Sequence, residues 1–233
     1  LDVAIGEVAD LIDQKGAAAV KAMFNDANIK PSVWGMPVNF RADEANWRNG
    51  LDALPRLAKA GQAIDCLRVS TWLLPGHNEL DYQANFEFHV DRLRPIAAIL
   101  ADHGIRFGLE WVGTKTLRES FEHPFIYTME GALELGAALG TDNMGLLVDI
   151  YHVENSGATA DDVRRLTNAQ VVYAHVNDGV AGVPVDERHD TIRDLPGYTG
   201  ELDLPGFLQA LKDINYDGPV TAEPFSQRLR DLP

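Results

Sequence analysis

Residues 144–152 read MGLLVDIYH, and residues 171–178 read VVYAHVND. Each stretch is a short apolar run that ends in a residue able to bind a metal ion, Asp149 in the first and His175 in the second. Continuous apolar runs of this length are typical of strands in a parallel sheet that helices cover. A segment with helical spacing lies between them at about 160–166, so the two stretches predict a strand–helix–strand unit.

The same alternation of strand-like and helix-like segments extends along the whole chain. The expected strands are a fragment at 1–4 and runs at 31–38, 66–71, 106–112, 144–151, 171–176 and 219–223. The expected helices lie at about 6–25, 47–58, 82–103, 129–139, 160–166 and 204–214. Such βαβ units build either a closed barrel or a doubly wound open sheet.

A doubly wound sheet needs a glycine-rich phosphate turn after an early strand, and the chain contains no GxGxxG motif. We therefore predict an α/β protein with a (β/α)8 TIM-barrel fold, forming a single domain over residues 1–233. Such a barrel has eight strands, and the sequence predicts six full strands and one fragment. We therefore expect this chain to lack the first β/α unit of the barrel. A closing helix after Phe225 is not expected either.

Composition excludes several classes of function. The chain carries 20 Lys and Arg against 35 Asp and Glu, a formal charge of −15, which disfavours nucleic acid and anionic membrane surfaces as partners. Its one cysteine cannot form an internal disulfide, and no apolar run approaches the length of a membrane span. No signal peptide is visible, so a cytoplasmic protein is expected. The sequence leaves open whether the chain forms a homo-oligomer.

Four consecutive expected strands end in residues with metal-binding side chains: Glu110, Asp149, His175 and Glu223. Side chains alternate along a strand, so these four share the face opposite their apolar neighbours. If the apolar set meets the helices, the four polar side chains point into the mouth of the barrel, where barrel enzymes have their active sites. Three carboxylates in one mouth repel one another unless a proton or a cation intervenes.

A divalent metal ion fits this set of ligands. Carboxylate oxygens favour the hard cations Mn2+ or Mg2+, and the imidazole also allows Co2+ or Zn2+.

The chain resembles the xylose isomerase-like TIM-barrel superfamily, which includes sugar isomerases, epimerases and endonuclease IV, and within it the inosose isomerase type. The motifs that carry the resemblance are EWVG at 110–113, DIYH at 149–152, HVND at 175–178, RDLPGYTGELD at 193–203, and Glu223. The resemblance implies one divalent metal ion held by Glu110, Asp149, His175 and Glu223. It also implies that Glu110 and Glu223 act as the acid/base pair, that His152 and Arg193 contact the substrate, and that the substrate is a small sugar or polyol-derived molecule. The chemistry agrees, because a cation that binds a carbonyl and a neighbouring hydroxyl acidifies the C–H between them and stabilises an enediolate.

Other residues near the strand ends have two interpretations each. The loop at 179–192 is long for the family and carries Arg188, which is an alternative to Arg193 as the substrate-binding arginine. Trp111, with Trp34 and Trp72, forms either an apolar wall against a sugar ring or packing at the barrel rim. Lys115 either reaches the substrate or is a solvated loop lysine.

The leading functional hypothesis is a metal-dependent isomerase or epimerase of a sugar, keto-sugar or inosose. A lyase of the dehydroshikimate dehydratase type begins with the same proton abstraction, so the sequence separates the two poorly. An endonuclease IV-like hydrolase would need a trinuclear site and a basic face, which the charge of −15 argues against. A catalytically inactive barrel stays as the non-enzymatic alternative.

Overall fold

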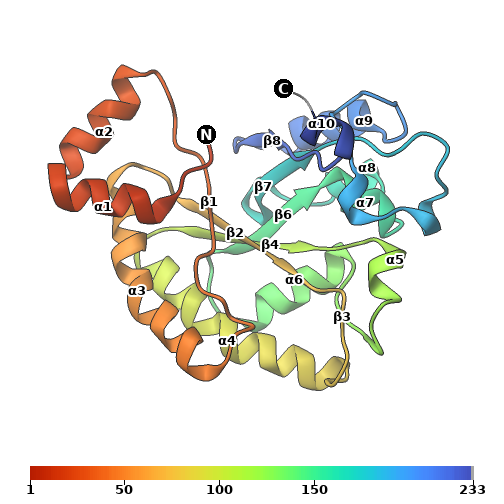
Figure 1. The fold of residues 1–233 in the computed structure, drawn as a ribbon, viewed down its shortest axis with the longest axis horizontal. Helices are drawn as coiled ribbons and strands as arrows, with labels where there is room; N and C mark the ends of the chain where they lie inside the picture. The colour runs from red at the N-terminus through yellow and green to blue at the C-terminus, as the bar shows by residue number, and fades with distance from the viewer. Residues whose placement is uncertain (232–233) are drawn as a thin grey trace.

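The computed structural model describes residues 1–231; the predicted domain boundary at 233 lies outside the described residues. Six parallel strands form one curled sheet in the order β1-β2-β4-β6-β7-β8, and helices cover its outer side (Figure 1). The strands are β1 (Trp34–Gly35), β2 (Arg68–Leu73), β4 (Arg106–Trp111), β6 (Met144–Asp149), β7 (Val171–Val176) and β8 (Val220–Ala222). A short antiparallel pair, β3 (Gly76–His77) and β5 (His123–Pro124), lies outside this sheet.

The helices follow the strands in the predicted alternation. They are α1 (Ile5–Lys15), α2 (Ala17–Asp26), α3 (Glu44–Ala63), α4 (Tyr82–Asp102), α5 (Lys115–Arg118), α6 (Met129–Ala138), α7 (Ile150–Asn155), α8 (Ala160–Arg164), α9 (Leu204–Asp213) and α10 (Gln227–Arg230). Within residues 1–231, none of them combines the length and the apolarity that a membrane crossing requires.

Several bounds differ from the sequence predictions: β1 is much shorter than the strand expected at 31–38, β2 is shifted by two residues from 66–71, and α3 extends beyond 47–58 at both ends. The sequence predictions do not include the short helices α5, α7 and α10. Two further differences have clear local causes. The helix expected at 6–25 is two helices, because Gly16 adopts φ +84° and ψ +150° between α1 and α2, a conformation that ends a helix. The strand expected at 144–151 ends at Asp149, because the Asp149 carboxylate accepts a hydrogen bond from the Tyr151 amide (2.7 Å) and so caps α7.

Alternation along the strands separates an outer core from the inside of the curled sheet. Leu109, Val148 and Ala174 are fully buried in the core between sheet and helices. Leu147 and Tyr173 belong instead to a small second cluster on the inner side of the sheet. Side chains two positions apart on a strand share a face, so Asp149 lies on the same inner face as Leu147, and His175 on the same face as Tyr173. Both residues lie at the C-terminal mouth of the sheet.

The first residues of the chain contact this inner face. Asp2 forms a parallel bridge with Val33, just before β1, and the Tyr173 hydroxyl on β7 donates to the Asp2 carboxylate (2.6 Å). Within the described residues β8 pairs only with β7. The sheet is thus a curled parallel half-barrel whose inner face is shared by residues from distant parts of the chain.

Candidate active site

The structure brings together the four strand-end residues that the sequence singles out. Glu110, Asp149, His175 and Glu223 each offer one ligand atom, and these four atoms lie within 4.8 Å of one another. His175 Nδ1 is 3.2 Å from Glu223 Oε2, 3.7 Å from Asp149 Oδ2 and 3.9 Å from Glu110 Oε1. We call these four residues the acid–histidine cluster.

The strand register explains why the four side chains meet. Asp149 on β6 is the direct neighbour of His175 on β7. Glu223 follows β8, and its amide donates to the carbonyl of Val176 (3.0 Å), which extends the β7–β8 ladder by one residue. Because β4, β6, β7 and β8 are adjacent in the sheet, Glu110 and Glu223 come from the two outer strands of this set and flank the other two residues.

Buried charges perturb the carboxyl groups of the cluster. Burial, with the nearby charges of Asp149 and Glu223, raises the pKa of Glu110 well above its usual value. Burial alone would also raise the pKa of Asp149, but the charge of Arg193 lowers it below its usual value. Arg193 Nη1 lies 2.6 Å from Asp149 Oδ2 and 3.1 Å from Glu223 Oε2.

The residues of the cluster fit a divalent metal ion. Glu110 Oε1 and His175 Nδ1 are both buried and have no hydrogen-bond partner. A buried polar atom left without a partner costs about 1–3 kcal/mol, and two such atoms 3.9 Å apart suggest a shared ligand. Three carboxylates and one imidazole are a donor set that Mn2+, Mg2+, Co2+ and Zn2+ can each accept.

Asp149 is held by further contacts that orient it. The Asn177 side-chain amide donates to both Asp149 carboxylate oxygens (2.9 and 3.1 Å), and Asn177 is fully buried. Groups that hold a ligating carboxylate in this way fix the geometry of metal sites. Sequence reasoning named Asn177 only as part of a family motif.

Of the predicted substrate-binding residues, His152 and Arg193 lie at the cluster. His152 is buried, and its Nε2 is 3.8 Å from Glu110 Oε1. Arg188 is also buried, but its side chain donates to the Val183 carbonyl (3.3 Å) and pairs with Glu201 (3.5 Å). The structure therefore joins Arg193, not Arg188, to the acid–histidine cluster.

Trp111 and Lys115 are placed away from the cluster. Trp111 is fully buried, and its indole N–H donates to the His152 carbonyl (3.2 Å), so it supports α7 from behind. Lys115 pairs with Asp186 (2.6 Å) and Glu119 (3.9 Å).

The other two tryptophans of the predicted wall differ from each other. Trp34 is fully buried. Trp72 on β2 is 45% exposed; it is the register neighbour of Glu110, and the Arg41 guanidinium lies 4.5 Å from the centre of its ring. Of the three, Trp72 alone presents an exposed ring beside the mouth.

Comparison with known proteins agrees with this geometry. The family model described as xylose isomerase-like TIM barrel matches residues 6–233. The chain belongs to this family. The predicted barrel fold and the resemblance are thereby confirmed, with the described residues forming an incomplete barrel.

Individual relatives are distant but cover most of the chain. An inosose isomerase from Halalkalibacterium halodurans is 25% identical over 216 residues, which is 91% of this chain and 73% of the relative. A xylose isomerase domain protein from Alicyclobacillus acidocaldarius is 31% identical, with a TM-score of 0.85 over 97% of this chain and 79% of that one. An IOLI protein, whose crystal structure contains a bound zinc atom, is 21% identical in sequence to this chain. The two structures align with a TM-score of 0.74 over 96% of this chain and 77% of that one.

This member of the xylose isomerase-like family also has an acidic residue at the mouth that sequence reasoning did not select. Asp190 Oδ1 is 3.4 Å from His152 Nε2, and also 3.3 Å from Arg193 Nη2. The only sequence signal for Asp190 is its position three residues before Arg193. The short helical turn at Asp190–Ile192 brings the side chains of Asp190 and Arg193 into contact.

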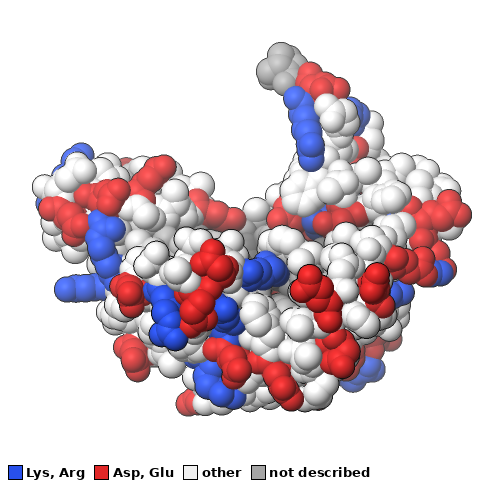
Figure 2. Space-filling view, turned by 60° about the horizontal axis from the view of Figure 1, so that its bottom comes forward, with Lys and Arg blue, Asp and Glu red and all other residues white. Residues whose placement is uncertain are grey.

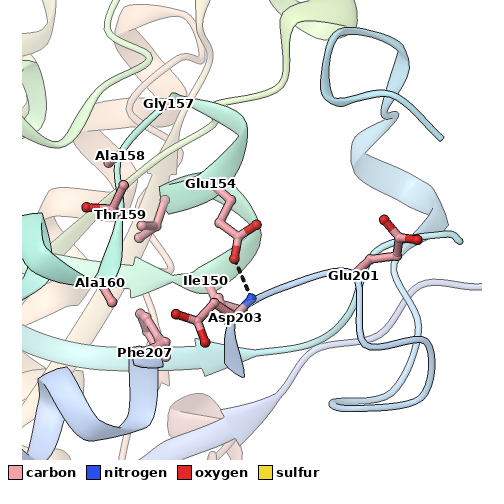
Figure 3. Close-up of a pocket in the computed structure, with 10 residues that line it drawn as sticks. Ile150, Glu154, Gly157, Ala158, Thr159, Ala160, Glu201, Asp203 and Phe207 are labelled. Carbon is pink, nitrogen blue, oxygen red and sulfur yellow. Dashed lines mark hydrogen bonds between the residues drawn. The ribbon is translucent and has the colours of Figure 1, made fainter. Parts of the chain in front are cut away.

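A separate cavity of about 380 Å3 lies on the outer side, between α7, α8 and the start of α9. Figure 3 shows the Glu154 carboxylate pointing at the backbone nitrogen of Asp203, whose N–H donates to it (2.6 Å), while the Asp203 carboxylate points the other way and Glu201 stands apart. None of the acid–histidine cluster lines this cavity. On the face shown in Figure 2, basic and acidic side chains are interspersed rather than gathered into a basic patch.

Proposed function

We propose that this protein is a divalent-metal-dependent isomerase or epimerase of a sugar, keto-sugar or inosose. The observation that carries the proposal is the acid–histidine cluster, in which four ligand atoms lie within 4.8 Å of one another and two of them are buried without partners. The inosose isomerase relative, which aligns with 91% of the chain, supports the substrate class.

Glu110, Asp149, His175 and Glu223 would hold the metal ion. When bound, such an ion supplies Lewis acidity that polarises a carbonyl and makes the adjacent C–H group more acidic. Mn2+ or Mg2+ suits the three carboxylates best, while the imidazole admits Co2+ or Zn2+.

The two glutamates have positions suited to proton transfer. Glu110 and Glu223 flank the cluster from β4 and from the end of β8, so they approach a bound substrate from different strands. One carboxylate removes a proton from carbon and the other returns it, as epimerisation or carbonyl migration requires. Arg193 contacts both Asp149 and Glu223 and offers further donors to an oxygen-rich substrate.

The test is a panel of inososes and ketohexoses incubated with the metal-loaded protein in D2O and followed by NMR. An isomerase or epimerase gives a rearranged product with deuterium at the reacting carbon and no loss of water. Release of water with formation of an enone would assign the dehydratase chemistry instead. Absence of both deuterium incorporation and product across the panel would contradict the proposal.

A further inference from the structure

Asp190 offers a buried acceptor that the acid–histidine cluster does not use. Its Oδ1 atom is buried and has no hydrogen-bond partner. The same atom lies 3.4 Å from His152 Nε2 and 3.3 Å from Arg193 Nη2. A carboxylate oxygen in this position has unused capacity to accept a hydrogen bond.

The hydrogen bonds of His152 determine which of its ring nitrogens is a donor. The Gly113 amide donates to His152 Nδ1 (3.3 Å), so Nδ1 is the acceptor and the ring proton resides on Nε2. Gly113 can approach this closely because it has no side chain: a Cβ there would lie 2.5 Å from the His152 carbonyl oxygen and 2.9 Å from the Ser156 amide nitrogen. His152 Nε2 lies 3.4 Å from Asp190 Oδ1 and 3.8 Å from Glu110 Oε1, and neither oxygen has a hydrogen-bond partner.

The loop that carries Asp190 is held in place by neighbouring elements. The Tyr151 hydroxyl donates to the His189 carbonyl (2.8 Å), and the Thr116 hydroxyl donates to the Arg188 carbonyl (2.7 Å). Arg193 Nε donates to the Asp190 carbonyl (3.0 Å). These contacts hold the backbone just before Asp190 and at the Asp190 carbonyl, so an anchored loop presents its side chain to the site.

We propose that His152 Nε2–H and Asp190 Oδ1 form a donor–acceptor pair that binds one hydroxyl group of the substrate beside Glu110. A hydroxyl satisfies both atoms, because it accepts from Nε2–H and donates to the carboxylate. A carbonyl, a methylene or an ether at the same position leaves at least one of them unsatisfied. The inference rests on the proposed function and narrows its substrate class to polyol carbonyl compounds with a free hydroxyl at this position.

A simpler role for Asp190 is to position Arg193, which it contacts through both its carboxylate and its carbonyl. The two roles differ in what they predict for substrate analogues. A residue that only positions Arg193 lowers kcat/KM by the same factor for the natural substrate and for an analogue lacking the hydroxyl. A residue that binds the hydroxyl lowers kcat/KM for the natural substrate alone.

The kinetic experiment uses 2-keto-myo-inositol and its monodeoxy analogues, or D-fructose and its monodeoxy analogues, whichever set the wild-type protein converts. We expect one deoxy analogue to lose about 10- to 100-fold in kcat/KM with the wild type and much less with Asp190→Ala. Asp190→Asn, which keeps an oxygen acceptor, should retain more of the discrimination than Asp190→Ala. Asp186→Ala is the matched control, because Asp186 lies in the same loop but pairs with Lys115.

A second measurement does not depend on turnover. Nitrogen-15 NMR of the metal-free protein, with His152→Gln to assign the signal, should show His152 protonated at Nε2. Protonation at Nδ1 instead, or equal loss for substrate and all deoxy analogues in Asp190→Ala, would overturn this inference while leaving the proposed function intact. Failure of the wild type to convert any member of the inosose and ketohexose panel would overturn both this inference and the proposed function.

Discussion

The two ends of strand β4 carry charged residues on the same face in opposite situations. Arg106 at the start of β4 donates through Nη2 to the carbonyls of Asn168, Ala169 and Val171, at 3.1, 2.7 and 2.9 Å. Glu110, four residues later, has a buried carboxylate oxygen with no partner. The two Cα atoms are separated by about 13 Å of strand.

The contrast extends to the neighbouring strands. At the N-terminal end, Arg68 donates to the Val172 carbonyl (2.8 Å) and pairs with Asp217 (3.0 Å). At the C-terminal end, His175 Nδ1 and Asp190 Oδ1 are buried without partners, as Glu110 Oε1 is. The N-terminal end also holds two buried amide oxygens without partners, Asn143 Oδ1 and Asn168 Oδ1, but its two arginines are paired. An unpaired buried ionisable group costs more than an unpaired amide, so the N-terminal end is suited to stability and the C-terminal end to binding. Substitutions at the two ends should therefore have different consequences.

The largest effect is expected for Glu223→Gln at the C-terminal end. Removing one member of the acid/base pair should lower kcat by about 100- to 10,000-fold. The free energy of unfolding of the metal-free protein should stay the same or rise, because one of the clustered negative charges is gone. Turnover and denaturant unfolding of wild type and variant check both parts, and a fully active variant would show that Glu223 carries no proton.

Metal binding should stabilise the C-terminal end. A cation present at 100 times its Kd should raise the free energy of unfolding by about 2.7 kcal/mol. Thermal unfolding with and without Mn2+ measures this, and Asp149→Asn serves as the matched variant with a weakened donor set. Equal stabilisation of wild type and Asp149→Asn would place the bound cation elsewhere.

Arg106→Met tests the N-terminal end. It removes the donor that three carbonyls share, so we expect a loss of about 2 kcal/mol in the free energy of unfolding. Turnover per folded molecule should be unchanged, and Arg106→Lys should recover part of the stability. A large fall in kcat without any loss of stability would break the contrast between the two ends.

In the metal-free protein, the titration of Glu110 should be visible in how the free energy of unfolding changes with pH. Its pKa is raised above the usual 4.5 by burial and by neighbouring carboxylates, so above pH 4.5 the folded state retains a proton that the unfolded chain has released. The free energy of unfolding should then fall as the pH rises through the raised pKa, by up to about 1.4 kcal/mol per pH unit. Glu110→Gln should flatten this slope; an identical slope in the variant would assign it to another group. The lowered pKa of Asp149 acts below pH 3.8, outside this window.

The smallest effect is expected for Lys115→Ala. Lys115 is partly exposed and pairs with exposed carboxylates, and such ion pairs contribute about 0–1 kcal/mol. Neither kcat nor KM should change by more than about twofold by this reasoning. A large rise in KM would mean that the loop opens and lets Lys115 reach the substrate.

Much of the fold and of the acid–histidine cluster could be predicted from sequence, because strand alternation and parallel pairing follow local rules. Asp149 and His175 end apolar runs, and their register follows once the strands are adjacent. Asp190 could not be predicted, because a loop conformation depends on tertiary contacts such as those of Tyr151 and Thr116. The role of Trp111 could not be predicted either, because its position at a strand end fits both a wall against a sugar ring and packing at the barrel rim. Only the tertiary structure shows that its indole packs against α7.

The most direct test of the account is the position of the metal ion. Crystals grown with Mn2+ and measured near its absorption edge should show one anomalous peak per chain, about 2 Å from ligand atoms of Glu110, Asp149, His175 and Glu223. A peak at any other place, or no peak at saturating Mn2+ and Zn2+, would contradict the central claim that these four residues form a divalent metal site.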